Sequence, residues 1–389
     1  MARSDPQVVL RCASGKHRVR LDDKRFWSAA RCPSCKTQVD PTRVQRLVAR
    51  GLVVSGMRTA TDRYALWLIA GTVGYLGLVL TGWTLLWGFA DAWWPGTLVL
   101  FGPRWLFLLP LLVLVPLAAL RQRPLLVPLA IAGLVVLFPI MGFRLGLGGS
   151  GGDEKGDVRV MTFNVASGRM LSRAMWEIIG STGVDIAAFQ ECGGQDYQGL
   201  LEVEGWNHHR SGSACLSTRF PIDTIVKMER EILEDGGGVG IVVRYTLRTP
   251  NGPLDVTNLH LETPREGLEP ITSGELSSGV SKLRATTVVR TTESRRAREL
   301  VDAGGNPFIV TGDFNMPVES NIYERYWSDL NNAFNAVGRG IGATRYNGWI
   351  RARIDHVLFS DGLAAVRSYV GPDFGSDHRP LIADLNWRR

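Results

Sequence analysis

The second quarter of the chain consists of long apolar runs with almost no charge. Residues 65–90 and 125–143 contain no charged side chain, and residues 98–120 contain only Arg104. Each run is long enough to cross the hydrocarbon core of a bilayer, which is about 30 Å thick. Membrane helices also tolerate the prolines in these runs. The pattern predicts three transmembrane helices within residues 64–145; the alternative is a buried bundle of apolar helices.

After the apolar runs, the pattern changes to short segments of strand length. Residues 146–156 are rich in glycine, which is typical of a flexible tether. Beyond the tether, apolar segments alternate with turn residues, and Asn251-Gly252 is a strong hairpin signal. We expect strands over residues 158–165, 184–190, 214–217, 222–228, 239–247, 254–261, 307–310, 354–359 and 380–385, and helices over 171–182, 282–303 and 319–334. Residues 157–389 are therefore predicted to form a mixed α/β domain, with a long polar loop over 262–281.

Charge divides the chain into the same parts. Residues 1–63 hold 14 Lys and Arg against 5 Asp and Glu, whereas residues 150–389 hold 26 against 31. Because basic segments stay in the cytoplasm, residues 1–63 and the loop 121–123 are expected inside. Three spans then place the last domain outside the inner membrane of a bacterial cell. Its mildly acidic balance does not favour nucleic acid as a partner, although it does not exclude one.

Three cysteines lie close together in the basic N-terminal segment, residues 1–63. Cys32 and Cys35 form a Cys-x-x-Cys pair, which is half of a zinc knuckle. Cys12 begins a second such pair in which glycine replaces the other cysteine, so His17 could supply the fourth ligand of a Zn²⁺ ion. The segment resembles a small, degenerate zinc ribbon. The alternative is a ribbon that has lost its metal.

Polar residues recur where the predicted strands end, and together they suit phosphoester chemistry. Thr311-Gly-Asp-Phe-Asn315 and Ser376-Asp-His378 each place a carboxylate beside another polar group after an apolar run. Either stretch alone could be a turn. Hydrolysis at a hard metal ion needs oxygen ligands, a group that activates water and donors for the charge that grows on phosphorus. The residues that offer these groups are Asn164, Glu191, His260, Asp313, Asn315, Asp355, Asp377 and His378.

The order of these motifs resembles the endonuclease/exonuclease/phosphatase superfamily, whose fold is that of deoxyribonuclease I. The matching stretches are TFNV (162–165), FQE (189–191), NLHL (258–261), TGDFN (311–315), RIDHVL (353–358) and SDHRPL (376–381). The resemblance implies an α/β (α+β) fold, in which two mixed sheets pack face to face between helices as a four-layered α/β/β/α sandwich. The whole chain would be a membrane-anchored, bacterial-type member of this superfamily.

The resemblance also implies roles in metal binding and water activation. Glu191 would be the main ligand of Mg²⁺ or Mn²⁺, with Asn164 and Asp377 near the metal or the phosphate. Asp313 would orient or deprotonate the attacking water. Asn315 would donate a hydrogen bond to a phosphate oxygen.

Two histidines would complete the implied site. His260 and His378 would hydrogen-bond the phosphoryl group, and one of them would protonate the leaving oxygen. Asp355 would orient His378 and raise its pKa, because a carboxylate stabilises the imidazolium form. His356 follows Asp355 directly, so it should point to the opposite face of the sheet and be structural.

Four more residues of reactive types match no motif of the superfamily. His208 and His209 are expected to be surface residues and not ligands. Cys192 and Cys215 are expected to be small buried residues. The sequence does not decide whether these two cysteines form a disulfide.

The sequence therefore predicts a membrane-anchored, Mg²⁺-dependent phosphoesterase that hydrolyses phosphodiester or phosphomonoester bonds with an activated water. The substrate stays open between extracytoplasmic DNA or RNA, a phospholipid headgroup and a small phosphoester. A non-catalytic membrane receptor or scaffold is the alternative from another class. Decay of that kind usually removes a metal ligand or the water-activating acid, and here every expected position is filled.

Overall fold

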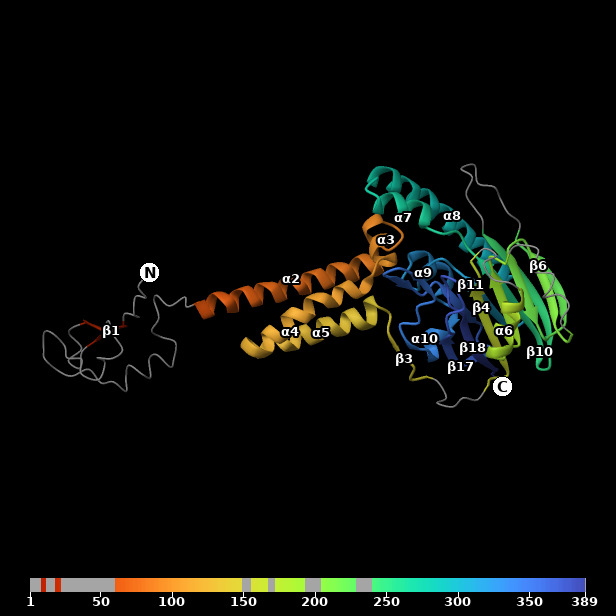
Figure 1. Cartoon of the computed structure of the whole chain (residues 1–389), viewed down its shortest axis with the longest axis horizontal. Coiled ribbons are helices and arrows are strands. Elements are labelled where there is room, and N and C mark those ends of the chain that lie inside the picture. Colours follow the sequence, from red (N-terminus) through yellow and green to blue (C-terminus); the bar gives the residue numbers. More distant parts are fainter. Residues whose placement is uncertain are drawn as a thin grey trace. The chain divides into compact units, whose positions relative to one another are not determined.

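Figure 1 shows the computed structural model of the chain, in which residues 8–11, 18–21, 60–148, 155–166, 172–192, 204–228 and 240–388 are described. The chain forms two compact units. One consists of residues 1–73 and 116–126, and the other of residues 74–115 and 127–389. The second unit contains all the predicted catalytic residues.

The first unit contains a short antiparallel pair of strands near the N-terminus. These are β1 (Val8–Arg11) and β2 (Arg18–Leu21). The predicted zinc ligands Cys12, His17, Cys32 and Cys35 lie outside the described residues. Zinc binding by this segment therefore stays a prediction.

Three helices among the described residues are long and apolar enough to cross a membrane: Tyr64–Gly88, Arg104–Arg121 and Arg123–Ile140. The second begins later than predicted, because Gly102 and Pro103 separate it from a short helix that precedes it. Many large apolar side chains on these helices are exposed, as expected for surfaces that face lipid. The elements are α2 (Ala60–Gly88), α3 (Trp94–Phe101), η2 (Arg104–Leu108), α4 (Leu109–Arg121), η3 (Arg123–Leu125), α5 (Leu126–Val135) and η4 (Val136–Ile140).

Two six-stranded sheets form the centre of the α/β domain. In each sheet one strand pair is parallel, β4 with β5 and β10 with β11, and the other pairs are antiparallel. The first sheet has the order β17 (Leu363–Val370), β18 (Leu381–Trp387), β4 (Val158–Asn164), β5 (Ile186–Gln190), β7 (Ala214–Thr218) and β6 (Asn207–Ser211). The second has the order β12 (Asn331–Asn332), β16 (Asp355–Phe359), β11 (Phe308–Asp313), β10 (Gly252–His260), β9 (Ile241–Thr249) and β8 (Ile222–Lys227).

Alternate side chains of the central strands are buried on opposite faces of their sheet. In β4, Val160 packs between the two sheets, whereas Met161 packs beneath α6 (Ser172–Thr182) on the outer face. In β11, Ile309 faces the other sheet, whereas Val310 packs outward in the cluster that includes residues of α8 (Leu276–Asp302) and α9 (Asn321–Trp327). This period of two produces helices outside two stacked sheets, and the predicted four-layered sandwich is confirmed.

Residues 262–281 are not the polar loop that was predicted. They contain α7 (Arg265–Thr272) and the first turns of α8. Glycines let these helices approach each other closely: a Cβ on Gly267 would lie 2.6 Å from the Leu283 side chain, and one on Gly279 would lie 2.4 Å from Ile271. The glycines that indicated a loop are therefore packing positions between two helices.

Other boundaries also differ from the prediction. The helix expected over 319–334 is divided into α9, β12 and α10 (Ala333–Val337), with Asn332 as the N-cap that accepts from the Asn335 amide. Strands β6 and β17 were not predicted. Their sequences lack the continuous apolar character of the central strands, because they lie at sheet edges. The remaining short elements are β3 (Arg144–Leu145), β13 (Arg339–Gly340), β14 (Arg345–Asn347) and β15 (Ile350–Ala352).

Gly312 is required by the close approach of β10 and β11. Its φ is +148°, and a Cβ there would lie 1.9 Å from the Leu259 carbonyl oxygen. No larger residue fits without moving a strand. This conformation holds the last residues of β10 and β11, His260 and Asp313, opposite each other in the sheet.

Candidate active site

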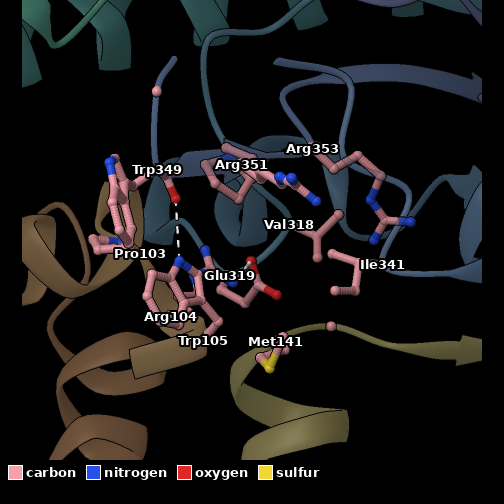
Figure 2. Close-up of a pocket in the computed structure, with 14 residues that line it drawn as sticks. Pro103, Arg104, Trp105, Met141, Val318, Glu319, Ile341, Trp349, Arg351 and Arg353 are labelled. Atoms are coloured by element: carbon pink, nitrogen blue, oxygen red, sulfur yellow. Dashed lines mark hydrogen bonds and ion pairs between the residues drawn. The ribbon is translucent and has the colours of Figure 1, made fainter. Parts of the chain in front are cut away.

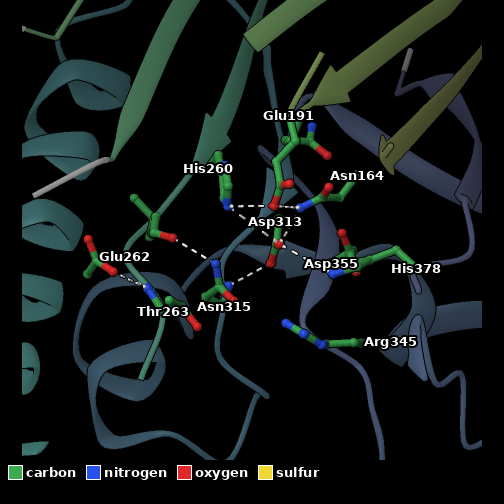
Figure 3. A network of polar contacts seen from close by, with 12 residues as sticks. Asn164, Glu191, His260, Glu262, Thr263, Asp313, Asn315, Arg345, Asp355 and His378 are labelled. Atoms are coloured by element: carbon green, nitrogen blue, oxygen red, sulfur yellow. Dashed lines mark hydrogen bonds and ion pairs between the residues drawn. The ribbon is translucent and has the colours of Figure 1, made fainter. Parts of the chain in front are cut away.

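The ends of three adjacent strands bring together three of the predicted catalytic residues. His260 at the end of β10 is in register with Asp313 at the end of β11, and Asp313 is in register with Asp355 at the start of β16. Asn164 ends β4 and Glu191 directly follows β5, so the other sheet contributes at the same place (Figure 3). These residues, far apart in the sequence, thus lie close together, and Glu191, His260 and Asp313 line one pocket.

The amide group of Asn164 joins the two carboxylates of the site. Its Nδ2 donates to Glu191 Oε1 at 3.0 Å and to Asp313 Oδ2 at 3.0 Å, and its Oδ1 accepts from the Ala166 amide (Figure 3). Ala166 and Glu191 both have positive φ, 53° and 56°. Such conformations are costly for residues other than glycine and are common at functional sites. Asn164 therefore fixes the separation of Glu191 and Asp313.

His378 and Asp355 form a buried pair next to Asp313. His378 Nδ1 lies 2.9 Å from Asp355 Oδ2, and His378 Nε2 lies 3.8 Å from Asp313 Oδ2. Although burial alone would lower the pKa of His378, the Asp355 and Asp313 carboxylates raise it to about 9. Burial also raises the pKa of Asp355, against the effect of His378. We assign the shared proton to His378, because two carboxylates face its ring.

Asp313 is held as a carboxylate. Burial alone would raise its pKa, but the neighbouring His378 and His260 hold the pKa below its usual value. His260 Nε2 lies 3.8 Å from Asp313 Oδ2 and 4.0 Å from Glu191 Oε1. Two imidazoles therefore flank a pair of carboxylates around one small space.

Asn315 lines the pocket in a constrained conformation. Its φ is +50°, its backbone N–H donates to Asp313 Oδ1 at 2.9 Å, and its Nδ2 donates to the Leu261 carbonyl at 2.8 Å. One amide hydrogen thus serves the fold. The role of Asn315 as a donor to phosphate stays a prediction. In that role its second amide hydrogen would bond to the phosphate oxygen.

The C-terminal motif contacts the site through Ser376 and through Arg345, the ion-pair partner of Asp377. Ser376 Oγ donates to the Asn164 carbonyl at 2.8 Å and accepts from the His378 amide. The carboxylate of Asp377, predicted to be near the metal, forms an ion pair with Arg345 at 3.2 Å. Arg345 lines the pocket, and no motif in the sequence indicated it.

The pocket has a volume of about 460 Å³, which suits a ligand of small-molecule size. Its wall combines three acids, Glu191, Glu262 and Asp313, with two arginines, Arg265 and Arg345. Arg265 is the first residue of α7 and is exposed. The arginines can attract an anionic substrate. A cation beside the acids would offset their repulsion of that substrate.

Residues assigned to structural roles lie outside this pocket. His356 is buried on the other face of β16, where Nε2 lies 2.9 Å from the Met316 carbonyl, and burial lowers the pKa of His356 to about 3. The prediction that it is structural is confirmed. His208 and His209 are half-buried in β6, and His209 Nδ1 lies 3.0 Å from the Tyr245 hydroxyl. They are thus part of the fold and less exposed than predicted.

A buried ion pair connects the active site to the apolar N-terminal part of the second unit. Asp91, between α2 and α3, pairs with Arg290 of α8 at 2.8 Å, and each side chain is only 1% exposed. Arg290 also donates to the backbone carbonyl of Asn315 at 3.1 Å, and Asp91 accepts from the Ser320 hydroxyl. Asp91 is the one acidic residue in residues 64–149, which was the only signal in the sequence for this contact.

The family follows from a comparison with protein-family models. The model described as Endonuclease/Exonuclease/phosphatase family matches residues 161–378, more than half of the chain. The chain belongs to the endonuclease/exonuclease/phosphatase family. Enzymes of this family are hydrolases that act on phosphoester bonds, and the chain is an enzyme of this class. No curated protein matches the chain.

Several solved structures are similar to this family member. They include a humanized TDP2 of D. rerio with 14 mutations (12% identity, 59% of this chain and 98% of that chain, TM-score 0.46). The 3' phosphatase NExo of Neisseria, bound to product DNA hairpin, is similar over 59% and 100% (16% identity, TM-score 0.46). The human Nocturnin catalytic domain is similar over 59% and 94% (19% identity, TM-score 0.43).

Enzymes of the endonuclease/exonuclease/phosphatase family typically depend on a divalent metal, and the donors in this site fit one. Glu191 and Asp313 accept from the same amide group, so their negative charges lie side by side, where a divalent cation would offset the repulsion. Asp313, Asp355 and His378 also present ligand atoms within 4.8 Å of one another. His378 and Asp355 already bond to each other, whereas Glu191 is 28% exposed, so Glu191 stays the predicted main ligand.

Proposed function

We propose that this protein is a membrane-anchored, Mg²⁺- or Mn²⁺-dependent phosphoesterase. The observation that carries the proposal is the Asn164 amide, which holds Glu191 and Asp313 together beside two histidines in one pocket. That arrangement supplies oxygen ligands, a carboxylate for water and donors for a phosphoryl group. A receptor without catalytic activity would not require all of these groups together.

Each side chain has a chemical task in this proposal. Asp313, kept ionised by its lowered pKa, accepts a hydrogen bond from the attacking water, orients it and takes up its proton as it attacks. His378, whose pKa is raised to about 9, is protonated at neutral pH and donates to a phosphoryl oxygen. Arg345 adds a positive charge at the pocket wall. A metal on Glu191, with Asn164 and Asp377 near it, would stabilise charge on the phosphate and lower the pKa of a bound water.

The position of the active site outside the cytoplasm is part of the proposal. Residues 1–63 are basic and precede three helices that are apolar enough to span a membrane, which supports a cytoplasmic N-terminus. Cys192 and Cys215, which the sequence left undecided, form a disulfide in the α/β domain. Disulfides persist in oxidising compartments, so this bond supports a domain that lies outside.

Metal removal tests the catalytic proposal. The full-length protein, purified in detergent, is expected to lose phosphoester hydrolysis in EDTA and to recover it with excess Mg²⁺ or Mn²⁺, because the carboxylates need the cation. The measurement is turnover of a chromogenic phosphodiester and monoester, plasmid DNA, RNA and phospholipids. Activity that is unchanged by EDTA would contradict the metal assignment. The panel also separates a nuclease from a phospholipid headgroup phosphodiesterase.

Thiol labelling tests on which side of the membrane the α/β domain lies. When whole cells are denatured in N-ethylmaleimide without reductant, Cys192 and Cys215 are expected to stay unlabelled, whereas Cys12, Cys32 and Cys35 should react. Mass spectrometry of the peptides gives the result, and the N-terminal cysteines of the same chain are the control. Labelling of Cys192 before reduction would argue for a catalytic domain in the reducing cytoplasm.

A further inference from the structure

A second pocket, of about 600 Å³, lies within the second unit where the ends of two candidate membrane spans meet the α/β domain (Figure 2). We call it the junction pocket. Arg104 and Trp105 begin one span, and Met141 directly follows another. These ends lie together, so they mark one depth in a bilayer. If the helices cross a membrane, the junction pocket lies at the level of the lipid headgroups.

Positive charge in the junction pocket exceeds negative charge. Arg104, Arg351 and Arg353 line it, and Glu319 is its one acidic lining residue. Glu319 is already paired with Arg104, at 3.1 Å. The lining therefore carries two arginines whose charge it does not balance.

Arg353 is the buried member of this group. It is 7% exposed; its Nη2 donates to Asn335 Oδ1 at 2.7 Å, but its Nη1 is buried without a hydrogen-bond partner among the described residues. Burial lowers the pKa of Arg353 to about 10, which shows that its neighbours do not offset the cost of burying the charge. An anion in the junction pocket would reduce that cost.

The rest of the junction pocket is apolar and aromatic. Trp105 stacks on Trp349 with ring centroids 5.7 Å apart, and its Nε1 donates to the Trp349 carbonyl (Figure 2). Trp349, at the tip of the β14–β15 hairpin, is 76% exposed. Tryptophan is typical of membrane interfaces, where its ring contacts both chains and headgroups. Val318 and Ile341 extend the apolar surface.

We propose that the junction pocket binds an anionic phospholipid of the adjoining leaflet, with its phosphate near Arg351 and Arg353. An amphiphile of this kind matches both the uncompensated arginines and the apolar wall, whereas a soluble phosphate ester uses only the arginines. Arginine pairs with phosphate through charge-assisted and often bidentate hydrogen bonds, which suits the headgroup of such a lipid. This site is separate from the catalytic pocket and does not depend on the proposed catalytic function.

Native mass spectrometry of the full-length protein in detergent tests this proposal. Titration with phosphatidylglycerol and phosphatidylcholine of equal chain length is expected to show tighter binding of phosphatidylglycerol. Arg351→Gln should weaken phosphatidylglycerol about fivefold, because one arginine near a lipid surface contributes about that factor. Arg351 is exposed, so its replacement should leave folding intact. Arg248→Gln, an exposed arginine of the same domain outside the junction pocket, is the control and should change nothing.

A second variant tests the apolar half of the junction pocket. Trp349→Ala should weaken long-chain phosphatidylglycerol, since the exposed ring would contact the lipid. Equal affinity for the two lipids, or unchanged binding in both Arg351→Gln and Trp349→Ala, would overturn the proposal. Binding of soluble glycerol phosphate as tight as that of phosphatidylglycerol would also overturn it, because the ligand would then be a free ester.

Discussion

Replacing Asp313 with Asn is expected to lower the turnover of phosphoesters about 10³-fold while the protein stays folded. The carboxylate lies between His260 and His378, which hold its pKa low, and it accepts from Asn164 and from the Asn315 amide. An amide of the same shape cannot accept a proton from water, and positioned acids and bases contribute about 10²–10⁴ in rate. The measurement is kcat on the best substrate of the panel at saturating Mg²⁺.

The matched control is Asp302→Asn. Asp302 is also a hydrogen-bonded carboxylate, paired with Arg298, but it lies on the exposed surface of α8. It should retain full activity. If Asp313→Asn retained most of its activity with the fold intact, Asp313 would not act on the water, and the assignment of the site would have to move to another carboxylate.

Replacing Asp91 with Leu is expected to destabilise the protein by about 3–5 kcal/mol. The change leaves Arg290 buried without its partner, and removing one member of a buried ion pair has an effect of this size. It should also lower activity, because Arg290 holds the backbone of Asn315. The measurements are the thermal unfolding midpoint and the turnover of full-length protein in detergent.

A double variant separates the two effects. Asp91→Leu with Arg290→Met removes both charges, so most of the stability should return. Activity should stay low, since no side chain then donates to the Asn315 carbonyl. Arg295→Met with Glu299→Leu, an exposed pair on the same helix, is the control and should change stability by less than about 1 kcal/mol. If activity returned together with stability in the first double variant, Arg290 would have no positioning role.

The candidate site residues could be found in the sequence because they lie at the ends of apolar strands. His260, Asp313 and Asp355 each border a run that must be buried, so the change from apolar to polar marks the sheet edge. Arg345 had no such signal, because its short strand β14 is half exposed. The glycines of residues 262–281 were misread for a related reason. A sequence does not distinguish a glycine that a turn requires from one that lets helices approach, as Gly267 does.

The sequence by itself determined the apolar segments, the order of the motifs along the chain and the residue types of the site. Burial and backbone period are local properties of a chain. Only the tertiary structure decided which distant residues meet. Asp91 and Arg290 are 199 positions apart, and Cys192 and Cys215 join across neighbouring strand ends. Contacts of this kind depend on how the sheets, helices and apolar segments pack, and no local pattern encodes them. The link from the apolar segment to Asn315 is therefore a property of the fold.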